Sequence, residues 1–312
     1  MKKYMYALAF FAFALSGQVY ADYPSSFNNA KSQMWQVYKD NRFDQYCGCP
    51  LGKGNRPDLQ ACGYDSRKNL KRASRSEAEH VVPAENLGRQ FACWGEGREN
   101  GKGGRDHCNA TDQAFRNAHN DLHNLMPVVG EVNGDRSNFR FGEIQAPYNQ
   151  YGQCQFKVDF SGRVAEPPPH MKGDIARIHF YMRDVHGLRL SDAQTKLYSA
   201  WNNMDPVSQW EITRDSRIEK AQGNSNYYVS GRKTNPPSVA PMRRPAQNGY
   251  KPYQSPIQAP ATTSSTSGKY DCERKTCGAM VSCEEAVHKL QQCGHKQLDR
   301  DGDGVPCEAI CK

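Results

Sequence analysis

Four polar residues along this chain could together cleave a phosphate ester. Glu79 directly precedes His80, and Arg105 and Asn133 follow in glycine-containing segments. Hydrolysis of a phosphodiester needs an activated water, neutralisation of charge on the phosphoryl oxygens and help for the leaving oxygen. Histidine, with an ordinary pKa of ~6.5, can accept a proton from water at neutral pH. Side-chain oxygens of glutamate and asparagine suit Mg²⁺, and arginine carries a fixed positive charge. These residue types predict a metal-dependent phosphodiester hydrolase.

The adjacency of Glu79 and His80 restricts the element that carries them. Successive side chains of a regular strand point to opposite faces, so the strand must end or turn if both are to face one site. Pro83, close behind, is consistent with such an end. Each residue also has a simpler explanation: His80 as a core histidine bonded to Glu79, Asn133 with the following glycine as a turn, and Arg105 as a solvated loop charge. The four residues alone leave these alternatives open.

The first 21 residues have the composition of a signal peptide. Two lysines precede an apolar run over residues 7–15, and Val19-Tyr20-Ala21 fits a signal-peptidase cleavage site. The run is shorter than the ~20 residues of a membrane-spanning helix. We therefore expect an exported chain with no transmembrane segment, with an uncleaved anchor as the alternative. The formal charge of +8 suits an anionic partner, either nucleic acid or a membrane surface.

The cysteines form two groups, which supports an oxidising compartment. Six lie before the middle of the chain and six in the last 41 residues: Cys47, Cys49, Cys62, Cys93, Cys108 and Cys154, then Cys272, Cys277, Cys283, Cys293, Cys307 and Cys311. Each group is even and can close its own disulfides, although six cysteines allow 15 connectivities. Zinc binding by the tail is disfavoured because the chain has no Cys-x-x-Cys pair.

The sequence predicts four parts: a signal peptide over 1–21, a main domain over 22–229, a linker over 230–268 and a small module over 269–312. The linker holds seven of the 18 prolines and no acidic residue, so it cannot form a packed core. Its five positive charges could hold a polyanion loosely. The module has no aromatic residue from Asp271 onward and needs disulfides or a metal to fold.

The main domain is expected to be a helical shell around an irregular, disulfide-pinned centre with little sheet. A first helix is predicted after a cap at Ser25 or Ser26, with Phe27, Ala30, Met34 and Val37 on one face, and a second helix contains Ile175, Ile178, Met182 and Val185. A third helix follows a cap at Ser191 and carries Leu197, Ala200 and Trp201. A fourth has Pro206 in its first turn, with Trp210, Ile218 and Ala221 on one side. The stretch 47–151 offers only short strand-like runs, such as 79–82 and 125–129.

Acidic residues alternate near the end of the chain. Asp299, Asp301 and Asp303 precede Gly304, as in the first half of an EF-hand loop. Glu308 comes earlier than the twelfth position of such a loop, so the loop is only EF-hand-like. Before it, a capping-box pattern at Ser282 and Gly294 as a stop predict a helix over 283–293.

The order of several motifs resembles the bacterial endonuclease I family. They are Glu79-His80-Val81-Val82-Pro83-Ala84, Asp121-Leu122-His123-Asn124-Leu125, Gly130-Glu131-Val132-Asn133-Gly134-Asp135-Arg136-Ser137-Asn138, Ala176-Arg177, Tyr181-Met182, Trp201-Asn202 and Ile218-Glu219-Lys220-Ala221-Gln222-Gly223-Asn224. The resemblance covers roughly residues 23–229. It implies an α+β fold, with a mostly helical, disulfide-pinned domain around a ββα-metal (His-Me finger) core.

The same resemblance implies roles for single residues. His80 would be the general base, Glu79 and Asn133 would hold one Mg²⁺, and Arg105 would contact the phosphate. His123 and Asn124, expected in the strand of their motif, would support the site. The family cleaves DNA and often RNA, single- or double-stranded, with little sequence preference, leaving a 5′-phosphate and a 3′-hydroxyl.

The chain also departs from the family pattern at several positions. Ala78 and Glu85 stand where relatives carry tryptophan, which predicts a smaller or more polar wall of the cleft. Ile212 stands where relatives carry a cysteine, and a second cysteine at the end of the domain is absent, which predicts one disulfide fewer than in relatives. None of these departures changes an expected catalytic residue.

The tail resembles the Excalibur domain, a small disulfide-rich extracellular module. That resemblance implies that Asp299, Asp301, Asp303 and Glu308 bind Ca²⁺; an acidic turn held by Cys307 is the alternative. The prediction is a secreted, monomeric, nonspecific endonuclease whose linker and tail could contact a cell surface or another polyanion. A noncatalytic DNA-binding or surface-anchoring protein is the main alternative. A zinc hydrolase is disfavoured because no His-x-x-x-His pair is present.

Overall fold

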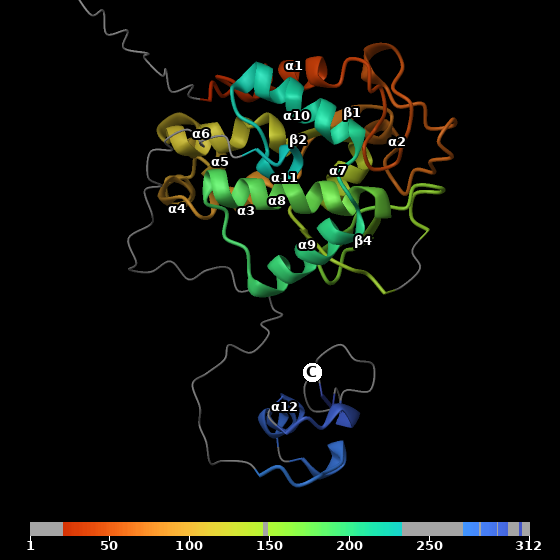
Figure 1. The fold of residues 1–312 in the computed structure, drawn as a ribbon, viewed down its shortest axis with the longest axis vertical. Coiled ribbons are helices and arrows are strands. Elements are labelled where there is room, and N and C mark those ends of the chain that lie inside the picture. Colours follow the sequence, from red (N-terminus) through yellow and green to blue (C-terminus); the bar gives the residue numbers. More distant parts are fainter. Residues whose placement is uncertain are drawn as a thin grey trace, which may run out of the picture. The chain divides into compact units, whose positions relative to one another are not determined.

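The computed structural model describes residues 21–145, 149–232, 271–280, 282–291, 293–298 and 306–307 (Figure 1). The chain separates into two units, Met1–Tyr250 and Lys251–Lys312, which are considered in turn. Residues 1–20, most of the predicted linker and the acidic residues Asp299, Asp301, Asp303 and Glu308 lie outside the described part. None of the described helices is long and apolar enough to cross a membrane.

Helix α1 (Phe27–Val37) begins at the predicted cap. The Ser26 hydroxyl accepts a hydrogen bond from the Asn29 amide at 3.2 Å, and Ala30, Met34 and Val37 are buried. This spacing places three apolar side chains on one face of the helix. The predicted amphipathic helix is confirmed, and its buried face packs on strand β2 and helix α10.

Three long helices enclose the first unit, as the sequence predicted (Figure 1). They are α8 (Lys172–His186), α9 (Asp192–Met204) and α10 (Gln209–Gln222), and the short α11 (Tyr227–Ser230) follows. Ser191 caps α9 through a capping box, as expected. The prediction for α10 was wrong at its start, because a second capping box begins at Ser208 and leaves Pro206 outside the helix. Ala221, expected on the packed face of α10, is exposed.

The middle of the chain is more helical than its glycine content indicated. It contains α2 (Leu70–Ala73), α3 (Ala84–Gly88), α4 (Ala92–Glu99), α5 (Gly104–Thr111), α6 (Gln113–Asn120) and α7 (Gly130–Arg136), with 3-10 turns at Lys53–Asn55 (η1), Leu122–Asn124 (η2) and Pro169–Met171 (η3). The glycines serve close packing here. A Cβ at Gly97 in α4 would lie 2.5 Å from the His107 Cβ in α5, and one at Gly104 would lie 2.5 Å from the Trp94 ring.

Two small sheets complete the described part of the first unit. Strands β1 (Ser76–His80) and β2 (Leu125–Val129) pair antiparallel, with Glu79 opposite Met126 and His80 opposite Leu125. Strands β3 (Arg140–Phe141), β5 (Val164–Glu166) and β4 (Lys157–Asp159) form a second sheet in that order. The strand predicted over 79–82 instead ends at His80, as the placement of Glu79 and His80 in one site required.

Disulfides pin the first unit in the predicted manner. The bonds are Cys47–Cys154, Cys49–Cys62 and Cys93–Cys108, so the first six cysteines pair among themselves. The last of these joins α4 to α5, next to the close approach at Gly97. The disulfide framework therefore stabilises the glycine-rich middle.

The second unit has a small core. Helix α12 (Cys283–Gln291) follows Ser282, whose hydroxyl accepts a hydrogen bond from the Glu285 amide at 3.2 Å. The helix ends before the predicted residue 293, and Gly294 has a positive φ of 72°. Disulfides Cys272–Cys293 and Cys277–Cys307 flank a cluster of Ala286, Leu298 and Cys307, beside the turns Cys277–Ala279 (η4) and Lys296–Leu298 (η5). As expected, these bridges accompany little apolar burial among the residues of this unit that the structure describes.

Candidate active site

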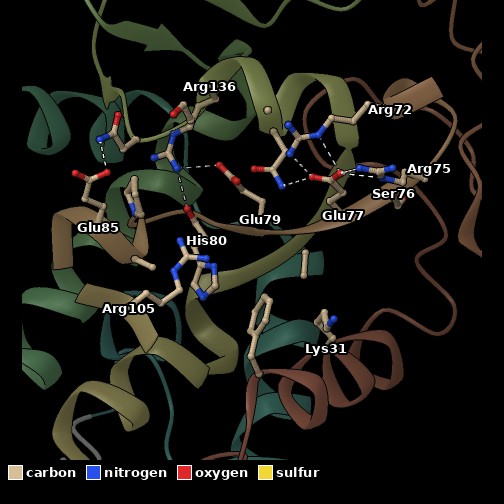
Figure 2. Close-up of a pocket in the computed structure, with 18 of the residues that line it drawn as sticks. Lys31, Arg72, Arg75, Ser76, Glu77, Glu79, His80, Glu85, Arg105 and Arg136 are labelled. Carbon is tan, nitrogen blue, oxygen red and sulfur yellow. Dashed lines mark hydrogen bonds and ion pairs between the residues drawn. The ribbon is translucent and has the colours of Figure 1, made fainter. Parts of the chain in front are cut away.

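The four residues singled out for chemistry line one pocket. Glu79 and His80 come from the end of β1 and Arg105 from the first turn of α5 (Figure 2). Asn133 comes from the middle of α7. The pocket has a volume of about 600 Å³. Its frame is the β1–β2 pair and α7, which directly follows β2. Residues separated by more than 50 positions thus meet in one cavity.

His80 is held in the tautomer that a base requires. Its Nε2 lies 2.8 Å from the backbone carbonyl oxygen of His119. A carbonyl can only accept, so Nε2 carries the proton and Nδ1 is left as an acceptor. Burial first, and then the charges of His119 and Arg105, lower the pKa of His80 well below its usual value. Phe27 stacks on the ring at 4.9 Å between centroids.

Glu79 is buried beside a guanidinium. Its Oε1 accepts from Nη1 of Arg136 at 3.0 Å and from the Tyr46 hydroxyl at 3.3 Å. Burial raises the pKa of Glu79 to about 7, against the opposing effect of Arg136. A divalent cation beside this carboxylate would favour its charged form.

Arg136 also shapes the end of β1. Its guanidinium donates to the backbone carbonyls of His80, at 2.8 Å, and Val81. These bonds take the place of strand pairing where the chain leaves β1. The turn that lets Glu79 and His80 face one pocket is therefore held by a side chain from α7, as Figure 2 shows.

Asn133 lies inside helix α7 and not in a turn. Its Nδ2 donates to Oε2 of Glu77 at 3.0 Å, which leaves Oδ1 as the atom that can bind a cation. Gly134 has a packing role instead of a turn role, because a Cβ there would lie 2.1 Å from Nη1 of Arg72. The alternative in which Asn133 merely forms a turn is wrong.

Glu77 is itself held by two arginines. Arg72 donates to both of its oxygens, at 3.0 and 2.7 Å, and Arg75 donates at 2.9 Å. Burial opposes ionisation, but these hydrogen bonds outweigh it and lower the pKa of Glu77. Glu77 is thus a fixed acceptor for the Asn133 amide.

Arg105 carries an exposed positive charge at the rim. It lines the same pocket as His80, and its charge contributes to the lowered pKa of both His80 and His119. In the described part of the chain, no carboxylate forms an ion pair with it. An arginine in that state can bind an anion that enters the pocket.

The two predicted supporting residues lie in the turn η2, before β2, and not in the strand. Neither lines the pocket. Asn124 bonds both backbone groups of Val82, accepting at 2.7 Å and donating at 3.0 Å. His123 packs on Tyr181 at 4.4 Å, and its Nε2 lies 3.2 Å from the carbonyl of Asn224. Asn124 thus holds the segment that follows His80, while His123 belongs to the core behind it.

Glu77 and Arg136 were missed by the sequence reasoning, although periodicity offered a signal for each. Glu77 lies two positions before Glu79, and therefore on the same face of a strand. Arg136 lies three positions after Asn133, about one turn along a helix. Glu77 thus lies on the same side of β1 as Glu79, and Arg136 on the same side of α7 as Asn133, and both line the pocket.

The described tail residues contain one group of metal-ligand types, formed by Cys272, His288 and Cys293, whose ligand atoms lie within 4.8 Å of one another. Cys272 and Cys293 are joined in a disulfide and so cannot act as thiolate ligands. The predicted calcium residues Asp299, Asp301, Asp303 and Glu308 lie outside the described part.

Comparison with known proteins identifies matches for both units. The model of the family described as endonuclease I matches residues 13–232, and that of the Excalibur calcium-binding domain matches residues 274–308. An extracellular deoxyribonuclease of Aeromonas hydrophila is 43% identical over 222 residues, 70% of this chain and 94% of the relative. An endonuclease-1 of Buchnera aphidicola subsp. Acyrthosiphon pisum is 42% identical, over 65% and 80% of the two chains. An extracellular endonuclease of Pseudomonas fluorescens is 32% identical, over 71% and 94%.

Proposed function

The chain belongs to the endonuclease I family, and we propose that it is a secreted, Mg²⁺-dependent endonuclease with little sequence preference. The observation that carries the proposal is the meeting of Glu79, His80, Arg105 and Asn133 in one pocket. Relatives named as extracellular or periplasmic deoxyribonucleases support both export and DNA as a substrate. More distant matches named as extracellular ribonucleases support RNA as a second substrate.

His80 acts as the general base in this proposal. The hydrogen bond to the His119 carbonyl keeps the proton on Nε2, and Nδ1 takes a proton from the attacking water. A lowered pKa keeps the imidazole neutral, and therefore able to accept, at physiological pH. Phe27 and the His119 carbonyl fix the orientation of the ring.

Glu79 and Asn133 hold the cation. A carboxylate and an amide carbonyl are hard oxygen donors, and so few protein ligands leave positions open for water and phosphate. When bound, Mg²⁺ supplies neutralisation of charge on the phosphoryl and leaving oxygens. The hydrogen bond from the Asn133 amide nitrogen to Glu77 leaves the amide oxygen as the atom that would bind the cation. The β1–β2–α7 order supports the ββα-metal core that the family resemblance implies.

Arg105 binds the phosphate that undergoes cleavage. Its guanidinium lies at the pocket rim near His80, so it can hold a phosphate oxygen while the base acts on water. Contacts to backbone phosphates carry no sequence information, which accounts for a broad substrate range. Cleavage leaves a 5′-phosphate and a 3′-hydroxyl.

Plasmid digestion with purified full-length protein tests the proposal. We expect Mg²⁺-dependent degradation that EDTA abolishes and that falls at least 100-fold in His80→Ala, the lower range for loss of a general base. His170→Ala removes an exposed histidine outside the pocket and should cut like the wild type. Undiminished cutting by His80→Ala would remove that residue from its role. Binding without cutting would favour the noncatalytic DNA-binding alternative.

The C-terminal module is proposed to bind Ca²⁺ through Asp299, Asp301, Asp303 and Glu308. The match to the Excalibur calcium-binding domain and the alternating carboxylates support it. Calorimetry of the full chain should show a Ca²⁺ site that Asp301→Ala removes and Glu79→Ala retains. The opposite pattern would assign the bound ion to the catalytic pocket.

A further inference from the structure

We propose that helix α1 forms a second nucleic-acid subsite beside the catalytic residues. In it, Lys31 contacts a backbone phosphate and the Trp35 ring stacks on an unpaired base. The subsite rests on the proposed nuclease function and deepens it, because it would let the enzyme bind single-stranded nucleic acid beside the catalytic residues. Three observations carry the proposal: the spacing along α1, the charges in the pocket and the placement of aromatic rings.

Helix α1 has a second stripe of side chains next to its buried face. Phe27, Lys31 and Trp35 follow one another at intervals of four, all are half-buried and all line the pocket. Residues at this interval share one side of a helix. The core face of α1 is formed instead by Ala30, Met34 and Val37. Helix α1 therefore buries one stripe in the core and presents the other to the pocket, where the half-buried rings of Phe27 and Trp35 also pack against the edge of the core.

Phe27 sets the position of this stripe relative to the chemistry. Its ring stacks on His80 at 4.9 Å with an interplanar angle of 24°. At 1.5 Å per residue, Trp35 lies about 12 Å farther along the helix axis. That length matches roughly three to four nucleotide steps at the 3.4 Å rise of a base-stacked strand, and fewer steps of an extended single strand. A strand cleaved at His80 can therefore reach Trp35 within a few nucleotides.

The pocket cations fall into two classes. Arg72 and Arg75 pair with Glu77, and Arg136 pairs with Glu79. Lys31 and Arg105 also line the pocket, but neither has an ion-pair partner within the described residues; the Lys31 Nζ lies 5.2 Å from the centroid of the Phe27 ring. Figure 2 shows them on either side of His80. Two unpaired cations that flank the base suit two phosphates on one strand, because nucleic-acid affinity comes mainly from such contacts.

The aromatic side chains of the pocket both come from α1. Phe27 is engaged with His80, whereas Trp35 has no ring partner among the described residues. The wall at Ala78 and Glu85 offers no ring. An indole beside an unpaired lysine is the arrangement that binds single strands, since bases stack on the ring while the cation follows the backbone. Bases in a duplex are already stacked on each other, so this contact selects unpaired ones.

The role of Lys31 is tested by the salt dependence of binding. Full-length protein in EDTA, which prevents cleavage, is titrated with a fluorescent single-stranded DNA 12-mer at several salt concentrations. Lys31→Gln should weaken binding and reduce the slope of log K against log salt by about 0.7, the value for one lost phosphate contact on a single strand. Lys31→Arg should restore the slope. Lys39→Gln changes an exposed lysine outside the pocket and should leave it unchanged.

The role of Trp35 is tested by comparing strand types. Trp35→Ala should weaken single-strand binding about 5- to 150-fold, the range for loss of one stacked base, and duplex binding by less than twofold. Trp35→Tyr, which keeps a ring, should retain most of the affinity. Single-stranded DNA should quench tryptophan fluorescence in the wild type and in Trp210→Phe, but not in Trp35→Phe.

These outcomes separate the subsite from the nuclease proposal. If the wild type cuts DNA with Mg²⁺ but the salt slope of Lys31→Gln is unchanged, or the quench persists in Trp35→Phe, the subsite is wrong and the nuclease stands. Equal losses for single and double strands in Trp35→Ala would likewise reduce Trp35 to a packing residue and overturn the subsite. If the wild type cuts no nucleic acid, the nuclease proposal itself fails. Should Trp35→Ala not fold, Trp35→Tyr, Trp35→Phe and the Lys31 variants still decide the question.

Discussion

At the scale of single residues, the pocket depends on side chains that never need to touch substrate. His80 takes its tautomer from a carbonyl of His119, and Asn133 takes its amide orientation from Glu77. Residues of this kind commonly change metal affinity or activity by 10–100-fold when removed. The orientation of the proposed ligand Asn133 therefore depends on Glu77 being held in place.

Glu77→Ala should weaken metal binding without removing a ligand. Loss of the acceptor lets the Asn133 amide rotate, so we expect the Mg²⁺ concentration for half-maximal cleavage to rise about tenfold. The rate at saturating Mg²⁺ should stay within a few-fold of the wild type. Titration of plasmid cleavage with Mg²⁺ measures both. Glu96→Ala removes an exposed glutamate outside the pocket as a control. An unchanged metal dependence in Glu77→Ala would show that Asn133 is oriented by other contacts.

At the scale of elements, glycines decide how closely two helices approach. Gly97 in α4 faces His107 of α5, while Gly95, two positions earlier in the same helix, faces open space. The disulfide Cys93–Cys108 joins the same two helices. Because Arg105 lies in the first turn of α5, this packing sets the position of the phosphate contact.

Gly97→Ala and Gly95→Ala form a matched pair on one helix. The Cβ of Gly97→Ala would meet the Gly103 carbonyl oxygen at 2.7 Å, so we expect a loss of about 1–3 kcal/mol in the free energy of unfolding. Gly95→Ala should instead add about 0.5–1 kcal/mol, because alanine favours a helix interior. Urea denaturation of both variants checks the sign. Equal effects would mean that α4 and α5 can separate without cost.

At the scale of the whole molecule, a buried polar network joins the helical shell to the strand pair. Asp121 accepts hydrogen bonds from the His123 amide, Gln222, the Tyr181 hydroxyl and His186, at 2.6 to 2.8 Å. Burial opposes its ionisation, but the hydrogen bonds and charge of His186 outweigh burial and lower the pKa of Asp121 to about 2. The carboxylate thus ties η2 to α8 and α10.

The lowered pKa of Asp121 predicts that the protein loses stability in a defined acidic range. A carboxyl whose folded pKa is depressed stabilises the protein above its unfolded pKa, and that contribution is lost as pH falls through the folded value. The window is therefore about pH 4 down to pH 2, and the loss is roughly 2 kcal/mol for a shift of this size. Asp121→Asn should have a lower free energy of unfolding at pH 7 than the wild type. It should also lack the loss of stability between about pH 4 and pH 2.

Urea denaturation at several pH values measures the Asp121 effect. Asp106→Asn replaces an exposed carboxylate and should keep the wild-type profile. If the wild type and Asp121→Asn lose the same free energy of unfolding between about pH 4 and pH 2, the acid sensitivity arises from other carboxylates.

Local sequence signals were sufficient for the features that depend on neighbours along the chain. The caps at Ser26, Ser191 and Ser282 were predicted because a hydroxyl bonds an amide two or three residues away. The end of a strand at His80 followed from the alternation of side chains. Family motifs supplied the four proposed catalytic positions, which the fold then brought into one pocket.

Only the tertiary structure decided the features that depend on contacts between distant segments. Periodicity could place Glu77 on the face of Glu79 and Arg136 one turn from Asn133, but it could not show that Arg136 bonds Glu79 or that Glu77 bonds Asn133. Nor could it show that the second stripe of α1 lines the pocket. Glycines that read as loop signals proved to be sites of helix packing, because tertiary proximity outweighs local propensity. Composition alone thus determined an exported, cysteine-bridged, cationic chain, whereas the orientation of each functional group depends on partners up to dozens of residues away.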